Sequence, residues 1–181
     1  MEFLRSSSFA IGICIGLIFC VIIFRFANRN KKLKSEYDER QLQIRGRSYM
    51  FAFYAVVIYE ALMTCLSIGG ILKSLPVEEY VFHACSIYVG AIVLCVHSVW
   101  NGAYWGLNNN IRRYVGIFIA LFILNLFPIV GVLANGVKTV DGYIDFPFIN
   151  LACTIMLVVL AITLLIRRRM DSKAEGQEEC L

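Results

Sequence analysis

Apolar residues fall into five long runs, and short polar connections separate them. A helix needs about 20 apolar residues to cross the hydrocarbon core of a bilayer. The runs cover residues 9–24, 49–72, 80–100, 115–134 and 146–166. The pattern therefore predicts an all-α fold, a polytopic membrane bundle of five transmembrane helices.

The composition supports a membrane protein and argues against a nucleic-acid-binding protein. Charged residues make up 17% of the chain, whereas soluble domains usually contain about 25%. The mean hydropathy is +0.71. The basic residues flank the apolar runs and do not form one patch, so we expect no nucleic-acid partner and take the lipid bilayer as the main surroundings.

The first apolar run resembles a signal peptide in length, but its C-terminal flank is different. No small-residue cleavage site comes after residue 24, and a basic cluster comes instead. Such a cluster anchors the segment and holds its end of the helix on the cytoplasmic side. We therefore expect an uncleaved signal-anchor helix over residues 1–24.

The distribution of Lys and Arg predicts the orientation of all five spans. Eight lie in residues 25–47, two between the third and fourth runs, and four in the C-terminal tail. The connections on the other side hold only Arg5, Lys73 and Lys138. Basic residues accumulate on the cytoplasmic side of a membrane. The prediction is an N-terminus outside and a C-terminus in the cytoplasm.

These boundaries divide the chain into four regions. We expect a signal-anchor helix (1–24), a basic cytoplasmic helical linker (25–48), a four-helix membrane core (49–166) and a charged cytoplasmic tail (167–181).

The predicted cytoplasmic linker carries a cluster of charged and polar side chains. Ser35 and Asp38 have the spacing of a capping box, which marks the start of a helix. The cluster fits either a charged flank that fixes topology or a docking surface for a cytoplasmic protein or anionic lipid. The predicted contact residues are Asp38, Glu39, Arg40, Gln41 and Arg45.

The same segment resembles a motif of small multi-pass membrane proteins from Gram-positive bacteria. The resemblance covers about twenty residues and is carried by Tyr37-Asp38-Glu39-Arg40-Gln41 and by Ile44-Arg45-Gly46 ahead of an apolar helix. It implies a bacterial plasma membrane, and it lends this chain no catalytic residue.

Polar residues inside the apolar runs are the candidates for a functional site. An ionisable residue is costly in a bilayer and is therefore a functional candidate by default. Glu60 is the one acidic residue of this kind. We expect it to be protonated, because burial disfavours its charged form, and to hydrogen-bond Asn125 or Tyr88. The predicted intramembrane cluster consists of Glu60, Tyr88, Asn125, His97 and Asn150.

A structural role for these polar residues remains open. Ser, Thr, Asn and His commonly join helices inside membranes by hydrogen bonds. In the first run, Gly12 and Gly16 form a G-x-x-x-G pattern, which allows close helix contact. That pattern fits self-association and packing within one chain equally well.

Neither a metal nor a cofactor is expected. None of the seven cysteines belongs to a C-x-x-C pair, so zinc and redox motifs are unsupported. Glu79 and His83 lie one helical turn apart, but two ligands are too few for a metal site.

Three classes of function compete. An enzyme is not expected, because the chain has no paired intramembrane carboxylates, no H-E-x-x-H and no G-x-S-x-G. A non-catalytic membrane protein that acts through contacts with a membrane or cytoplasmic partner requires nothing the chain lacks. The alternative is a small carrier or proton-coupled permease that uses Glu60 and the polar residues around it.

Overall fold

The computed structural model describes residues 37–104 and 111–178, together with six separate residues between 15 and 25. It contains the helices α2 (Glu39–Ile68), α3 (Glu79–Trp100), α4 (Ile111–Asn135) and α5 (Phe148–Glu178). A short 3-10 helix, η1 (Leu72–Ser74), comes after α2, and the strands β1 (Lys138–Val140) and β2 (Tyr143–Asp145) lie between α4 and α5. The all-helical prediction is confirmed.

Within the part of the chain that the structure describes, four helices are long and apolar enough to cross a membrane. They span Glu39–Ile68, Glu79–Trp100, Val115–Asn135 and Phe148–Ser172. These correspond to the second to fifth apolar runs. The predicted first span, with Gly12 and Gly16, lies outside the described residues except for isolated positions.

Two helices extend well beyond their apolar runs. Residues 39–48 of the predicted linker and most of the predicted second span form one helix of 30 residues, α2, which is about 45 Å long at 1.5 Å per residue. Helix α5 continues past the predicted span to Glu178. Both extensions carry charged residues, and a membrane helix is free to continue into water because its backbone bonds are internal.

The start of α2 corrects the predicted capping box. Asp38 is the N-cap, and its side chain accepts a hydrogen bond of 2.6 Å from the backbone N–H of Gln41. The Gln41 side chain in turn accepts from the backbone N–H of Asp38. Asp38 therefore begins the box and does not close one begun by Ser35, which lies outside the described residues.

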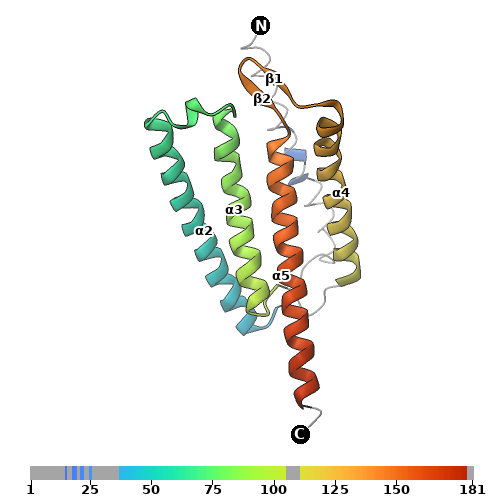
Figure 1. Cartoon of the computed structure of the whole chain (residues 1–181). Helices are drawn as coiled ribbons and strands as arrows, with labels where there is room; N and C mark the ends of the chain where they lie inside the picture. Colours follow the sequence, from blue (N-terminus) through green and yellow to red (C-terminus); the bar gives the residue numbers. More distant parts are fainter. Residues whose placement is uncertain are drawn as a thin grey trace. The chain divides into compact units, whose positions relative to one another are not determined.

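The four helices pack in the order α2, α3, α5, α4 (Figure 1). Helix α3 packs against α2 and α5, and α5 packs against α3 and α4. The order differs from the sequence because α5 inserts between α3 and α4. Helices α2 and α4 consequently lie at opposite sides of this group (Figure 1).

Helices α2 and α3 approach each other closely at Gly90. A Cβ atom at Gly90 would lie 2.7 Å from Cγ2 of Val56 and 3.8 Å from the carbonyl oxygen of Ala52. Gly90 is buried and faces α2. The absence of a side chain therefore lets the two helices come together.

A β-hairpin connects α4 to α5, and the sequence analysis did not foresee it. Val140 pairs with Tyr143 across a turn formed by Asp141 and Gly142. Both turn residues have positive φ, 53° and 85°, as a type I′ turn requires. The hairpin is joined to the α2–α3 connection by a hydrogen bond of 2.8 Å from Ile144 N to Pro76 O.

Candidate functional site

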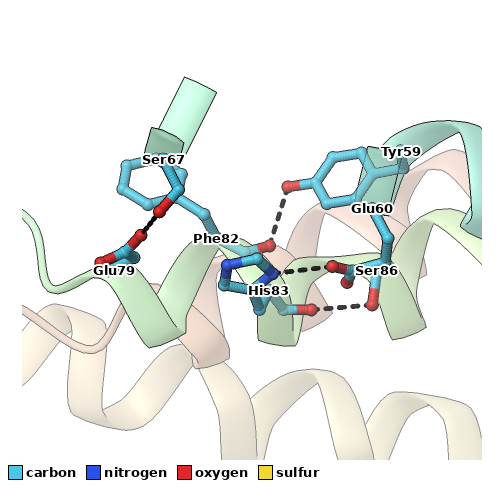
Figure 2. Close-up of polar contacts among 7 residues, drawn as sticks. All are labelled: Tyr59, Glu60, Ser67, Glu79, Phe82, His83 and Ser86. Atoms are coloured by element: carbon cyan, nitrogen blue, oxygen red, sulfur yellow. Dashed lines mark hydrogen bonds and ion pairs between the residues drawn. The ribbon is translucent and has the colours of Figure 1, made fainter. Parts of the chain in front are cut away.

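Glu60 on α2 and His83 on α3 form a polar pair across the helix interface. Nδ1 of His83 lies 2.7 Å from Oε2 of Glu60. Ser86, almost one turn after His83, lies beside the pair and donates a 2.7 Å hydrogen bond to the His83 carbonyl oxygen (Figure 2). The side chains of His83 and Glu60 are 39% and 34% exposed. Glu60 and His83 are thus bonded to each other, and part of each side chain remains exposed.

Two further contacts hold α2 and α3 together near the pair. The hydroxyl of Tyr59 donates to the carbonyl oxygen of Phe82 at 2.9 Å. The hydroxyl of Ser67 donates to the carboxylate of Glu79 at the start of α3 (Figure 2). Glu79 therefore bonds a serine on the neighbouring helix, and His83 bonds Glu60.

A second polar contact joins α2 and α3 near the other end of α3. The hydroxyl of Ser48 lies 2.7 Å from Nδ1 of His97 and also donates to the Ile44 carbonyl oxygen at 2.8 Å. Ser48 is fully buried. The ring of Phe51 lies 5.0 Å from the His97 ring, measured between centroids. His97 is therefore fixed between an α2 hydroxyl and an α2 aromatic ring.

The third polar contact joins α4 and α5. Nδ2 of Asn150 donates to Oδ1 of Asn125 at 3.3 Å. Asn125 also donates to its own helix, to the Leu121 carbonyl oxygen at 2.8 Å. Thr154 bonds the Asn150 carbonyl oxygen in the same way. The two amides therefore link neighbouring helices, and the Asn125 amide also bonds a carbonyl oxygen of its own helix.

The structure places the predicted cluster in three separate contacts. Glu60 pairs with His83, so the predicted bond to Asn125 or Tyr88 is wrong. For Asn125 the reason is the helix order, since α3 and α5 lie between α2 and α4 (Figure 1). Tyr88 comes five residues after His83 on α3 and so points about 140° away from it around the helix, at 100° per residue. Tyr88 is half-buried on α3. One hydrogen bond joins Glu60 to His83 whichever of them carries the proton, so the protonation of Glu60 stays a prediction.

Two of the predicted cytoplasmic contact residues bind the chain itself. Nε2 of Gln41 donates to the Gly102 carbonyl oxygen at 3.2 Å. Nη1 of Arg45 donates to the Ala103 carbonyl oxygen at 3.4 Å, and its guanidinium lies 4.4 Å from the Tyr37 ring centroid. Gln41 and Arg45 therefore hold the segment after α3 by hydrogen bonds to Gly102 and Ala103. We call this set of contacts the clamp. Glu39 and Arg40 remain exposed.

A third side chain, from α5, completes this clamp. Nη1 of Arg167 donates to the Trp100 carbonyl oxygen at 3.0 Å. Cations are favourable at a helix C-terminus, where the last carbonyl groups lack helical partners. Arg45 and Arg167 thus stabilise the end of α3 from both of its neighbours.

Tyr104 directly follows Ala103, which Arg45 holds. Burial raises the pKa of its phenol to about 12, and the nearby Arg45 guanidinium lowers it slightly. The neutral phenol is therefore the form that the folded chain stabilises.

Sequence reasoning missed His83 as the partner of Glu60, although a signal was present. Successive spans run in opposite directions, and elements that follow one another along the chain are usually neighbours in space, so α2 and α3 are expected to pair as antiparallel helices. Such pairing sets residues near the end of α2 against residues near the start of α3. Glu60 and His83 are then at comparable depth.

The described residues contain no group of three or more His, Cys, Asp or Glu side chains that could hold a metal ion. The chain matches no protein-family model, no curated protein and no solved structure.

Proposed function

We propose that this chain is a non-catalytic multi-pass membrane protein that acts through contact with a membrane-embedded or cytoplasmic protein partner. The proposal includes five spans, an outside N-terminus, a cytoplasmic C-terminus and a bacterial plasma membrane. The distribution of Lys and Arg supports the orientation. The short resemblance around Asp38 to Gln41 supports the bacterial assignment.

The observation that carries the proposal is the pairing of polar groups inside the spans. Each pair joins two neighbouring helices, Glu60 to His83, Ser48 to His97 and Asn150 to Asn125. Thr154 and Thr163 bond carbonyl oxygens of their own helix. Groups used in this way hold a bundle together. A carrier would instead need them around a shared interior that a substrate can enter.

The open side of the Glu60–His83 pair is the proposed contact face. Leaving polar groups against lipid is unfavourable, and ionisable residues in membranes almost always face protein or water. Ile87, one turn after His83, is 73% exposed on the same face of α3. The partner expected here is a membrane helix that offers a hydrogen-bonding side chain to the pair.

Photo-crosslinking tests this face against a matched one. A benzophenone amino acid would replace Ile87 on α3 or Phe127 on α4, which is 79% exposed. We expect a discrete crosslinked product from position 87 in native membranes, and its loss in Glu60→Leu. Glu78→Gln, an exposed carboxyl outside the spans, should leave the product unchanged. Equal products from both positions, or a product insensitive to Glu60→Leu, would contradict the contact face.

The Glu60–His83 pair also favours one alternative, a proton-coupled carrier. A carboxyl and an imidazole 2.7 Å apart are suited to exchanging a proton. Purified chain in liposomes would then move protons or a cosubstrate under a pH gradient, and Glu60→Gln would abolish that flux. A flux of protons or cosubstrate that depends on Glu60 would contradict the contact proposal and support the carrier.

Cysteine accessibility tests the proposed orientation. In a chain without its native cysteines, Gln43→Cys and Ser172→Cys should be labelled only from the cytoplasmic side. Lys73→Cys and Lys138→Cys should be labelled only from outside. All four positions are exposed, so a failure to label reflects sidedness. Labelling of residues 43 and 73 from one side would overturn the topology.

A further inference from the structure

A polar hollow of about 140 Å³ lies where α2 begins and α3 ends. Its wall includes Asp38, Arg40 and Gln41 from the start of α2, Asn101 and Gly102 after α3, and Arg167 from α5. Since one water takes about 30 Å³ of liquid, the hollow has room for a small polar group.

The hollow has donors that the fold does not use. The exposed guanidinium of Arg40 has no partner among the described residues. Arg167 uses Nη1 for the Trp100 carbonyl oxygen and Nε for Asp171, at 3.0 Å each, which leaves its Nη2 available. Asp38, the acidic residue in the wall, is committed to the N-cap of α2. Arg167 forms an ion pair with Asp171, so Arg40 is the cation of the wall that has no ion-pair partner among the described residues.

The hollow lies at the level where the apolar spans end. Arg167 is the first charged residue after the apolar part of α5, and Asn101 comes directly after α3. Trp100, the last residue of α3, is 47% exposed, and tryptophan favours the headgroup level of a membrane. A ligand in this hollow would therefore be a component of the membrane surface.

We propose that the hollow binds the phosphate of an anionic phospholipid headgroup, with Arg40 and Arg167 as its ligands. The planar fork of the Arg40 guanidinium matches phosphate oxygens, and Nη2 of Arg167 adds a donor from a second helix. Basic pockets between membrane helices on the cytoplasmic side bind anionic headgroups. The proposal rests on the proposed function in that it assumes the chain to be embedded in a membrane with this end inward.

Lipid-selective quenching of Trp100 provides the test. A Trp105→Phe chain would be placed in phosphatidylcholine nanodiscs that contain a small fraction of brominated phosphatidylglycerol or brominated phosphatidylcholine. The ratio of the two quenching constants reports selectivity at this end of α3. We expect brominated phosphatidylglycerol to quench preferentially. Arg40→Gln should lower that preference about fivefold, the factor that corresponds to ~1 kcal/mol per basic residue near an anionic surface.

The matched control is Arg47→Gln. Arg47 is exposed on the same helix and takes no part in the wall of the hollow. It should leave the preference unchanged. Arg40→Lys, which keeps the charge but loses the fork, should give an intermediate preference. Equal losses from Arg40→Gln and Arg47→Gln would show diffuse surface attraction and would overturn the proposal.

A soluble-phosphate arm separates the two sources of the ligand. Inorganic phosphate should not reduce the lipid preference more than chloride does at the same ionic strength. Displacement by phosphate alone would identify a soluble anion as the ligand and overturn the lipid assignment. The quenching test and the crosslinking test can fail independently. Lipid selectivity can be absent while the Glu60-dependent crosslink from position 87 persists, and the crosslink can be absent while lipid selectivity persists.

Discussion

The α2–α3 and α4–α5 interfaces join antiparallel helices in different ways. Helices α2 and α3 are joined by polar contacts at both ends, Glu60–His83 and Ser48–His97, and approach closely at Gly90. Helices α4 and α5 have the single long amide contact of 3.3 Å between Asn150 and Asn125 among the described hydrogen bonds. Gly131 on α4 has open space where its Cβ would be.

This difference indicates that α2–α3 is the fixed part of the described chain. Small residues and interhelical hydrogen bonds stabilise helix pairs in membranes, where apolar side chains gain little by leaving lipid. The α2–α3 interface has both features, and the clamp at the end of α3 adds a third. A partner docking on this pair would therefore meet a preorganised surface, which lowers the entropic cost of binding.

The largest effect is expected from filling the close approach at Gly90. Gly90→Leu should destabilise the chain by about 3 kcal/mol, the upper end of the usual overpacking range, because Val56 is β-branched and turns only with difficulty. Gly131→Leu is the matched control and should change stability by less than about 1 kcal/mol. Steric trapping in bicelles would measure both. Similar values for the two variants would contradict the difference between the interfaces.

Alkaline pH should loosen the clamp at the end of α3. Burial raises the pKa of Tyr104 to about 12, above the ordinary value of about 10. Its contribution to stability is therefore complete below about pH 10 and is lost as the pH rises toward 12. The loss should reach roughly 2 kcal/mol, after a discount for partial exposure.

The phenolate absorbance of Tyr104→Phe, compared with the parent chain, would isolate the Tyr104 titration. The same variant should remove this part of the pH dependence of unfolding. Ionisation of Tyr104 near pH 10 would show that the phenol is not buried and that the clamp is open.

Much of the fold could be predicted from the sequence, because hydropathy determines which segments can span a bilayer. The runs at 80–100 and 115–134 coincide closely with α3 and with most of α4, and the run at 146–166 coincides with the first part of α5. The order in which the helices pack could not be predicted, because the pattern of apolar residues does not specify which helices become neighbours. The hairpin was missed even though Asp141-Gly142 between β-branched and aromatic residues is a strong turn signal.

The candidate site was predictable only in part. Glu60 stood out because an acidic residue in a span is rare, but its partner depends on helix pairing. The prediction of one intramembrane cluster gave it Asn125 or Tyr88 as a partner, and Asn125 lies on the other side of α3 and α5. Likewise, the sequence places Gln41 and Arg45 in a surface contact motif, whereas their bonds to Gly102 and Ala103 depend on where α3 ends.

A moderate effect is expected from Ser48→Ala. The substitution leaves Nδ1 of His97 without its 2.7 Å contact and should cost about 1 kcal/mol. Ser98→Ala is the matched control, because Ser98 is also buried, at 2% exposure, and has no side-chain partner among the described residues. Steric trapping should separate the two variants. Equal costs would assign the effect of Ser48→Ala to packing.

The smallest effect is expected at the α4–α5 contact. A double-mutant cycle of Asn150→Ala and Asn125→Ala should give a coupling energy of no more than about 0.6 kcal/mol, the average for such bonds in membranes, because the 3.3 Å contact is long and Asn125 keeps its bond to Leu121. Asn135→Ala, which loses only a bond to its own helix, should show no coupling to Asn150→Ala. The same cycle on Ser48 and His97 should give the larger value. If the Asn125–Asn150 coupling is the greater, α4–α5 is the fixed pair and a partner would find its preorganised surface there.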